Sequence, residues 1–378
     1  MITSAHSPLD DRIFYKEARS LRKNGYDVTV IAPATKSIKK DTLIDKIKIL
    51  VVPRYKSKLL RPLTLFHLFI RGFKTNADVY HCHEPDALLS GILLKLLKRK
   101  KLIYDVHEHW PDGLSEKPFF PRFVKIIVKK IINTVEKKIS GFPNYILTVD
   151  HILKKEFSKY NKKVLVVANF PEPMFFRSTE DNALMKKYNN RQLIIYVGGL
   201  TPDRGILESI KAIELVRNKI ENVKLLFVGP FQDTKYEKKV LDYIKSHNLK
   251  NLVEFTGPVP YGEVPKYLGI SKLGLLLLQP TVIYSKTPYP IKLFEYIGYS
   301  LPVISGNLPE LRKIINEINC GISVDPTNLR EISDAIIYLL ENPSEAKKMG
   351  ENGRKAVEEK YNWEMMEKRL LKVYDNLV

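Results

Sequence analysis

Cysteine is scarce in this chain of 378 residues, which holds only Cys82 and Cys320, far apart in the sequence. Such a pair is no disulfide framework, so we expect two free thiols in a reducing compartment. Long apolar runs are also lacking, and none approaches the roughly 20 residues that a membrane-spanning helix needs. The first residues, MITSAHSPLDD, have neither the basic start nor the apolar middle of a secretion signal. The sequence therefore predicts a cytoplasmic protein.

Several well-known motifs are missing too. No strand pattern is followed by GxGxxG, which counts against a dinucleotide-dependent dehydrogenase. The HExxH spacing of helical metalloproteases is absent. There is no helix-turn-helix, zinc-finger or RNA-recognition signature, so a basic nucleic-acid-binding protein is a weak alternative, and no nucleic-acid partner is expected.

Acidic residues are few beside basic ones: 42 Asp and Glu against 62 Lys and Arg give a net charge of +20. This balance favours an anionic partner, such as phospholipid headgroups or a phosphorylated small molecule, although a solubilising surface would look the same. Segments 61–74 and 119–139 combine basic and apolar side chains at helical spacing. Their apolar sides are expected to face a core, while their basic sides could contact an anionic membrane.

Short β-branched runs alternate with helical patterns along the whole chain. Continuous apolar strands separated by helices indicate parallel sheets covered on both faces. A stretch rich in Pro and Asn within residues 167–190 carries no clear strand and separates the two halves. We expect an α/β protein of two doubly wound, Rossmann-like domains, residues 1–166 and 167–360, with a helix at 361–378 that crosses back. Ligands of such sheets bind at the carboxyl ends of the strands, here in a central cleft that the two domains face.

In the second half, the run IIYVGGLTPDRGILESI leads from a strand through Gly198 and Gly199 to a helix that starts near Gly205. Glycines after a strand let backbone N–H groups approach a phosphate, and the helix N-terminus favours an anion. The guanidinium of Arg204 could add a forked contact to phosphate oxygens. Plain tight turns also use glycines, so this pattern alone is weak.

The run SKTPYPIKLFEYIGYSLPVIS places Lys292 near the start of a helix. A cation is unfavourable there unless an anion, such as a diphosphate, binds at the same place. Glu295, one turn later, can accept hydrogen bonds from ribose hydroxyls. The alternative is a Lys–Glu pair on the helix surface, which is worth only a few tenths of a kcal/mol.

In the first half, two hydrophobic strands end abruptly in polar residues. The first end carries His81, His83, Glu84 and Asp86, and the second carries Asp105, His107, Glu108 and His109. These side chains could ligate a metal, act as acid–base groups, orient sugar hydroxyls or simply cap turns. The loop after the first strand adds His6, Asp10, Asp11 and Arg12, of which either aspartate could cap the following helix.

Taken together, these segments resemble the retaining nucleotide-sugar glycosyltransferases of family 4, of the group 1 type with the GT-B fold. The resemblance lies in the glycine turn with its basic residue, in PIKLFEYIGYSLPVIS, in HSPLDDRIFYKEARSLRKNGYDVTVIA and in RKAVEEKYNWEMMEKRLLKVY. It covers nearly the whole chain. It implies that the first domain binds the acceptor and the second domain binds the donor.

The resemblance also implies roles for individual residues. Its donor-binding positions are Gly198, Gly199, Arg204, Thr287, Pro290, Lys292 and Glu295. The first domain's strand-end histidine, which touches the transferred sugar, corresponds to His107, so the catalytic set is His107, Arg204 and Lys292. His6, Asp11, Arg12, His83, Glu84 and Glu108 lie on the acceptor side. The chain departs from the family where a first glutamate is replaced by Thr287, and where Gly199 stands in place of a frequent basic residue.

The implied reaction moves a sugar from a UDP- or GDP-sugar to a glycan or lipid-linked acceptor with retention of configuration. It requires no metal or other cofactor, and it fits cell-envelope polysaccharide assembly at the inner face of the plasma membrane. A nucleotide-sugar 2-epimerase of the same fold is the alternative. An epimerase would convert the donor without any acceptor.

Overall fold

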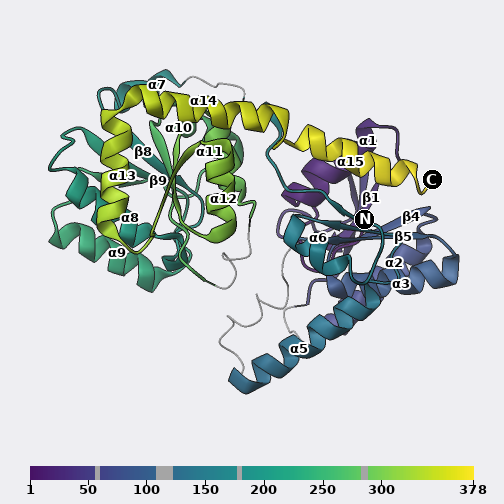
Figure 1. Cartoon of the computed structure of the whole chain (residues 1–378). Helices are drawn as coiled ribbons and strands as arrows, with labels where there is room; N and C mark the ends of the chain where they lie inside the picture. The colour runs from purple at the N-terminus through teal and green to yellow at the C-terminus, as the bar shows by residue number, and fades with distance from the viewer. Residues whose placement is uncertain (56–59, 108–121, 177–180, 282–287) are drawn as a thin grey trace. The chain divides into compact units, whose positions relative to one another are not determined.

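The computed structural model describes residues 1–55, 60–107, 122–176, 181–281 and 288–378 (Figure 1). It divides into two compact units. The first unit comprises Met1–Asn169 and Trp363–Val378, and the second comprises Phe170–Asn362. No helix in the described ranges is long and apolar enough to cross a membrane.

The first unit is a sheet with helices around it. Its strands are β1 (Thr29–Pro33), β2 (Thr42–Ile44), β3 (Ile47–Val52), β4 (Val79–Cys82), β5 (Lys101–Val106), β6 (Tyr145–Thr148) and β7 (Val164–Val166). Its helices are α1 (Arg19–Lys23), α2 (Arg61–Lys74), α3 (Pro85–Lys98), α5 (Arg122–Ile139), α6 (His151–Phe157) and α15 (Trp363–Asp375). The strand orders are β1-β3-β2 and β4-β5-β6-β7, and all described pairs are parallel except β2 with β3.

The first strand expected from the sequence is reduced to a single bridging residue. Ile2 pairs in parallel with Ile31 of β1 and with Cys82 of β4, so it joins the two groups of strands. Ile2 therefore lies where the strand order reverses, with β1 and β3 on one side and β4 to β7 on the other. The loop that follows Ile2 lies at the carboxyl ends of these parallel strands. Ligands of doubly wound sheets bind at this kind of position.

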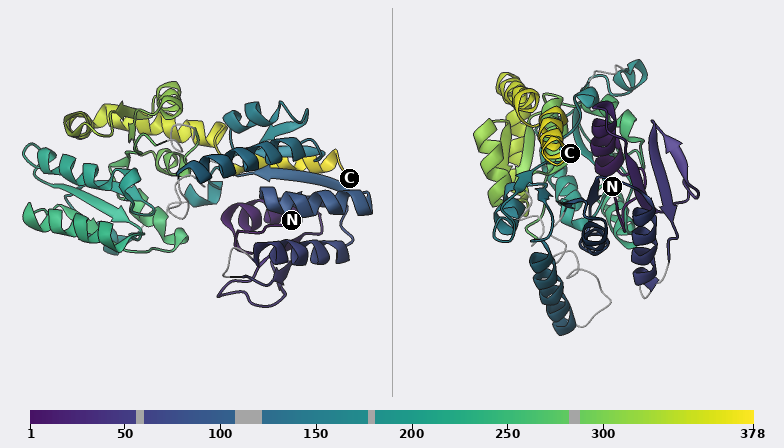
Figure 2. Two further views of the ribbon diagram at one scale, coloured as in Figure 1. Left: turned by 90° about the horizontal axis from the view of Figure 1, so that it is seen from below. Right: turned by 90° about the vertical axis from the view of Figure 1, so that its right-hand side faces the viewer.

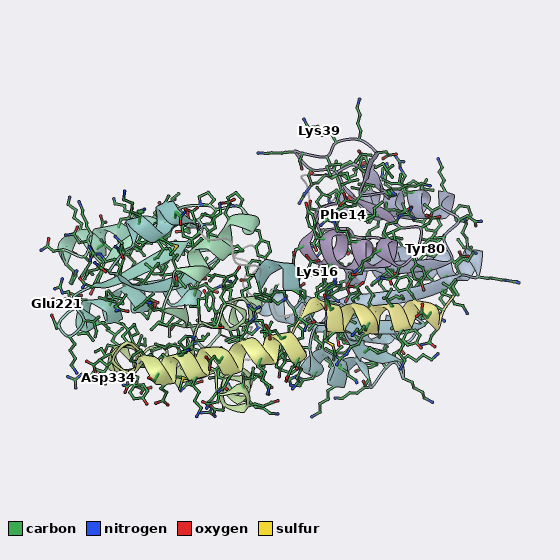
Figure 3. The ribbon with its side chains drawn as sticks, turned by 90° about the horizontal axis from the view of Figure 1, so that it is seen from above. Phe14, Lys16, Lys39, Tyr80, Glu221 and Asp334 are labelled. Carbon is green, nitrogen blue, oxygen red and sulfur yellow. The ribbon has the colours of Figure 1, made fainter. Side chains whose placement is uncertain are left out.

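The chain next forms a π-helical segment, Asp11–Ala18, which continues into α1. Asp10 caps it, because its carboxylate accepts hydrogen bonds from the N–H groups of Arg12 and Ile13. The wider turn of this segment buries the polar Arg12, Lys16 and Glu17 beside the apolar Ile13 and Phe14. Phe14 and Lys16 are labelled in Figure 3. Short π-helical segments frequently occur at functional sites.

The C-terminal helix α15 packs on the first unit (Figures 1 and 2). The indole N–H of Trp363 donates to Ser20 Oγ at 2.9 Å, and the Tyr26 hydroxyl donates to Asp375 at 2.7 Å. Trp363, Leu370 and Val373 are buried, so the helix contributes an apolar face as well as polar contacts.

The second unit holds six parallel strands in the order β10-β9-β8-β11-β12-β13. The strands are β8 (Gln192–Val197), β9 (Val223–Val228), β10 (Val253–Phe255), β11 (Leu273–Leu276), β12 (Val303–Gly306) and β13 (Gly321–Val324). The helices are α7 (Asn182–Lys187), α8 (Ile206–Val216), α9 (Thr234–Ser246), α10 (Val264–Gly269), α11 (Ile291–Gly298), α12 (Pro309–Ile318), α13 (Leu329–Glu341) and α14 (Pro343–Glu359).

In the second unit, α8 packs against α13 and α11 packs against α14, and helices cover the sheet on both sides (Figure 1). The chain adds β9 and β10 on one side of β8 and then crosses over to add β11 on the other side. The strand order therefore reverses between the neighbours β8 and β11. This is the topological switch point of a Rossmann sheet, where nucleotides bind. The prediction of two Rossmann-like α/β domains is confirmed.

Candidate active site

The glycine turn after β8 and the start of α11 meet at this switch point. Gly198 has a φ of +125°, which only glycine adopts without strain. A Cβ atom at Gly198 would lie 2.4 Å from Cε and 2.9 Å from Nζ of Lys292. The lysine side chain therefore lies directly on the turn, and a larger residue at 198 would displace it. The two sequence segments that suggested a diphosphate site therefore lie next to each other in the fold.

Two tyrosines hold the turn. The Tyr196 hydroxyl donates to the carbonyl of Gly199 at 3.0 Å, and the Tyr296 hydroxyl accepts from the N–H of Val197 at 2.8 Å. A Cβ atom at Gly199 would lie 2.2 Å from Nε2 of Gln232, so this position is also closely packed. Tyr196, Tyr296 and Gln232 were missed by the sequence analysis, because nothing in their spacing distinguishes them from core or surface residues.

Arg204 ends a short 3-10 turn, Pro202–Arg204, and its charge lies close enough to the Tyr196 hydroxyl to oppose the rise that burial causes in the pKa of that group. Burial and the nearby charge of Arg204 lower the pKa of the half-buried Lys292 to about 8, although Glu295 and Asp203 oppose this. Two cations are thus held together beside a turn of backbone amides. An anion bound between them would relieve their mutual repulsion.

Glu295 is 4% exposed, and it accepts a hydrogen bond from the Tyr261 hydroxyl at 2.9 Å. Tyr261 in turn stacks on Phe175, with 4.9 Å between ring centroids. Pro290 occupies the cap position of α11 with an extended backbone, so it defines where the helix begins. Thr287 lies outside the described residues.

In the first unit, Glu84 organises the loop that follows Ile2. Its carboxylate accepts from Thr3 Oγ1 and, at 2.9 Å, from the N–H of Ser4. His6 Nε2 lies 3.6 Å from the same carboxylate, while His6 Nδ1 lies 3.0 Å from Asp10 Oδ2. Glu84 itself is fully buried. It therefore positions the loop and His6 rather than offering its own oxygens to a ligand.

Arg12 is buried in the same way and is satisfied within the protein. Its Nε and Nη2 donate to the two oxygens of Asp105 at 2.8 and 2.9 Å, and Nη1 donates to the carbonyl of Val167 at 2.8 Å. Glu17 Oε1 lies 3.0 Å from Arg12 Nε. Three ionisable side chains, Arg12, Asp105 and Glu17, thus lie in the core beneath the strand ends.

Histidines complete this buried cluster. His107 Nε2 lies 3.1 Å from Asp105 Oδ2, and it also lies 3.1 Å from His83 Nδ1. His81 Nδ1 pairs with the Tyr374 hydroxyl of α15 at 3.0 Å. The rings of His6 and His107 lie side by side, 5.1 Å apart between centroids. Of these histidines, His81 and His83 are fully buried, whereas His6 and His107 reach partly into solvent.

The protonation states follow from the cluster's charges. Burial opposes ionisation of Asp105, but Arg12 and His107 outweigh it and hold the pKa of Asp105 well below its usual value. Burial and the neighbouring Asp105 raise the pKa of Glu17 well above its usual value. Burial lowers the pKa of His83 to about 3. The cluster therefore holds Arg12 and Asp105 as an ion pair, while burial disfavours the charged forms of Glu17 and His83.

One group of side chains in the described ranges could hold a metal ion. Ligand atoms of Glu17, His81, His83 and Asp105 all lie within 4.8 Å of one another, and all four residues are buried. From the residues alone, metal ligation was one of several roles left open for His81, His83 and Asp105, the family resemblance implied no metal, and Glu17 was not singled out. The Arg12 guanidinium contacts both carboxylates, so the protein itself places a positive charge at this position.

The structure thus gathers most of the predicted residues into two places. In the second unit it brings together Gly198, Gly199, Arg204, Lys292 and Glu295, with Pro290 at the start of α11. In the first unit it brings together His6, Arg12, His83, Glu84 and His107. Asp11 lies apart from this cluster: its half-exposed carboxylate pairs with Lys16 at 2.8 Å. Glu108 lies outside the described residues.

Both halves of the chain match profiles of glycosyltransferase families. The sequence profile of the glycosyl transferases group 1 matches residues 178–356, and that of glycosyltransferase family 4 matches residues 12–171. A capsular polysaccharide biosynthesis glycosyltransferase of Staphylococcus aureus, CapM, is 23% identical and covers 95% of this chain and 92% of its own. The chitobiosyldiphosphodolichol beta-mannosyltransferase of Kluyveromyces lactis is 27% identical, over 88% of this chain and 79% of its own.

Among solved structures, Anabaena HepE in complex with UDP and glucose has a TM-score of 0.76 to this chain. The match covers 100% of this chain and 99% of HepE at 14% sequence identity. At this identity the likeness concerns the fold.

Proposed function

Because the chain belongs to the group 1 glycosyltransferases of the GT-B fold, we propose that it moves a sugar from a nucleoside diphosphate to a glycan or lipid-linked acceptor, with retention of configuration. The second unit binds the donor, and the first unit binds the acceptor. The observation that carries the proposal is the position of Lys292 Nζ against the Gly198 turn, with Arg204 close enough to affect its charge.

A UDP- or GDP-sugar fits the donor site in three ways. The backbone at Gly198 and Gly199 lets amide groups approach a diphosphate closely. Lys292 and Arg204 supply two positive charges for its oxygens. Glu295, held by Tyr261, offers an acceptor to ribose hydroxyls. HepE, a structural neighbour, is described with UDP and UDP-glucose, which supports UDP as the first nucleotide to try.

The proposed chemistry concentrates charge on the leaving diphosphate. As the glycosidic bond to phosphate breaks, the sugar acquires oxocarbenium character and the departing oxygens gain negative charge. Lys292, Arg204 and the N-terminus of α11 stabilise that charge in place, without reorganisation of water. The acceptor hydroxyl attacks from the side of the leaving group and gives its proton to the departing phosphate. The step therefore needs no protein nucleophile.

On the acceptor side, we assign direct contact with the sugars to His6 and His107, the two histidines of this cluster that are not fully buried. Arg12, His83 and Glu84 support them from the core through Asp105 and the Thr3–His6 loop. Asp11 is proposed to act only from the edge of the site, because Lys16 already engages its carboxylate.

The biological setting that fits best is cell-envelope polysaccharide assembly on the cytoplasmic side of the membrane. CapM, by its name, serves capsular polysaccharide biosynthesis, and the Kluyveromyces enzyme is named for a dolichol-linked acceptor. An acceptor carried on a lipid diphosphate would also suit a protein with a net charge of +20.

The reaction class is tested by product analysis. With a UDP- or GDP-sugar alone, we expect little change of the donor. With an acceptor extract or a synthetic lipid-linked saccharide, we expect a new glycosidic bond and release of the nucleoside diphosphate. The coupling constant of the anomeric proton in the product, measured by NMR, should indicate the same anomeric configuration as in the donor. Interconversion of the free donor without an acceptor would favour the epimerase, and an inverted anomeric centre would overturn the retaining mechanism.

A further inference from the structure

Helix α3 of the first unit is apolar on both sides. Ala87, Leu88 and Leu94 point into the core and are fully buried. Leu89, Leu93, Leu96 and Leu97 follow one another at spacings of four, three and one residues, so they lie on one outer stripe. These four leucines are 43% to 64% exposed. A helix that is hydrophobic all round is normally covered on all sides.

The apolar surface extends beyond α3. Helix α2 packs beside α3, closely enough that a Cβ atom at Gly72 would lie 2.7 Å from Leu94 Cδ1. Exposed apolar side chains on α2 and just after α5 are Leu63, Phe66, Phe73 and Phe142. In the second unit, by contrast, the exposed large apolar residues fall singly on separate elements: Met185, Leu215, Leu241, Tyr261 and Tyr338. Clustering of this kind marks an interaction surface.

Basic side chains border this surface. Lys98 Nζ lies over the ring of Phe73 at 4.8 Å, and Lys95 Nζ donates to the carbonyl of Phe142 at 2.6 Å. These two lysines connect α3 to the end of α2 and to the residues that follow α5. The run from Lys98 to Lys101 reads KRKK, whereas Asp86, in the first turn of α3, is the only acidic residue in α2 and α3.

We propose that this leucine face, defined by Leu89, Leu93, Leu96 and Leu97 together with Phe73 and Phe142, inserts into the interfacial region of an anionic lipid bilayer. Leucine and phenylalanine side chains enter the boundary between headgroups and acyl chains, while the bordering lysines pair with anionic headgroups. A second copy of the chain would bring the same lysines against one another, which disfavours self-association through this face.

This inference deepens the proposed function by naming the surface from which the enzyme would reach a lipid-linked acceptor. It differs from an attraction of basic helices alone, because it requires the apolar side chains of α3 to leave water. The test is therefore made by binding, without any substrate, so that its outcome does not depend on the proposed reaction.

The experiment is co-sedimentation of the full-length protein with vesicles of phosphatidylcholine, with and without 30 mol% phosphatidylglycerol, that is, about one anionic lipid in three. We expect binding to the anionic vesicles and at least ~10-fold weaker partitioning of Leu93→Asp/Leu97→Asp, because each substitution removes an inserted apolar group. The matched control is Leu215→Asp/Leu241→Asp, which adds the same charge at exposed leucines of the second unit. It should bind as the wild type does.

Insertion itself is read from a second variant that keeps the face apolar. The emission of Leu96→Trp should shift to the blue with anionic vesicles and be quenched by brominated acyl chains, whereas Leu241→Trp should show neither change. Failure of the wild type to sediment would overturn the proposal. So would equal binding by Leu93→Asp/Leu97→Asp and the control, or a wild-type dimer in solution that only Leu93→Asp/Leu97→Asp abolishes.

Discussion

Replacement of Lys292 by alanine is expected to lower kcat/KM at least ~100-fold, the scale of losing one charged group that stabilises a transition state. The loss follows from the position of Nζ on the Gly198 turn, where the leaving diphosphate is proposed to gain charge. Lys347→Ala is the matched control, since this lysine is 77% exposed on α14. Steady-state kinetics of both variants test the role, and unchanged transfer by Lys292→Ala would refute it.

The same lysine should give the wild-type enzyme an alkaline limit. Because the pKa of Lys292 is lowered to about 8, the free enzyme loses this charge as pH rises through that value. We therefore expect kcat/KM to fall above about pH 8, and Lys292→Arg to move the limit upward.

Keeping the lysine charged also costs folding stability below its ordinary pKa of 10.5, since the folded state binds the proton less tightly than the unfolded state. Loss of activity in Lys292→Ala should thus occur without loss of thermal stability.

Replacement of Arg12 by methionine is expected to destabilise the first unit by about 3–5 kcal/mol, the cost of leaving one member of a buried ion pair unpaired. Arg12 is 3% exposed, and it provides the bidentate contact that keeps Asp105 ionised. Urea unfolding followed by circular dichroism measures the change.

Arg19→Met is the control for this effect. Arg19 follows the same π-helical segment and pairs with Asp45 at 2.6 Å, but both side chains are nearly half exposed. Surface pairs of this kind contribute about 0–1 kcal/mol. Equal effects of the two substitutions would contradict the burial argument. Adding Asp105→Leu to Arg12→Met should restore part of the stability, because no charge is then buried alone.

The sequence predicted that the Gly198 turn and Lys292 would lie together, and the structure brings them together. Gly198 and Lys292 each break a local rule: the glycine follows a strand without a hairpin, and the lysine stands at the wrong end of a helix dipole. Such conflicts between the usual preference of a residue and its position can be recognised from the amino-acid sequence alone. The fold class was readable for a similar reason, since buried parallel strands are continuous apolar runs.

The buried charged cluster of the first unit was harder to predict from the sequence. Glu17 looks like any charged helix residue, and its burial follows from the π-helical turn that carries it inward with Arg12. No residue type in DDRIFYKEA indicates that this segment forms a π-helical turn. Two further features were not predicted. The short edge strand β2 pairs with β3 in a hairpin whose turn is Asp45 and Lys46, neither of which is glycine. The first strand is reduced to Ile2, whose partners Ile31 and Cys82 lie far along the chain.

The account depends most on where the diphosphate of the donor binds, and a crystal structure with UDP, or with GDP if UDP does not bind, tests this directly. We predict phosphate oxygens within hydrogen-bonding distance, about 2.7–3.2 Å, of Lys292 Nζ and of the backbone N–H of Gly199. A nucleotide bound with its diphosphate away from both Lys292 and the Gly198 turn would contradict the account.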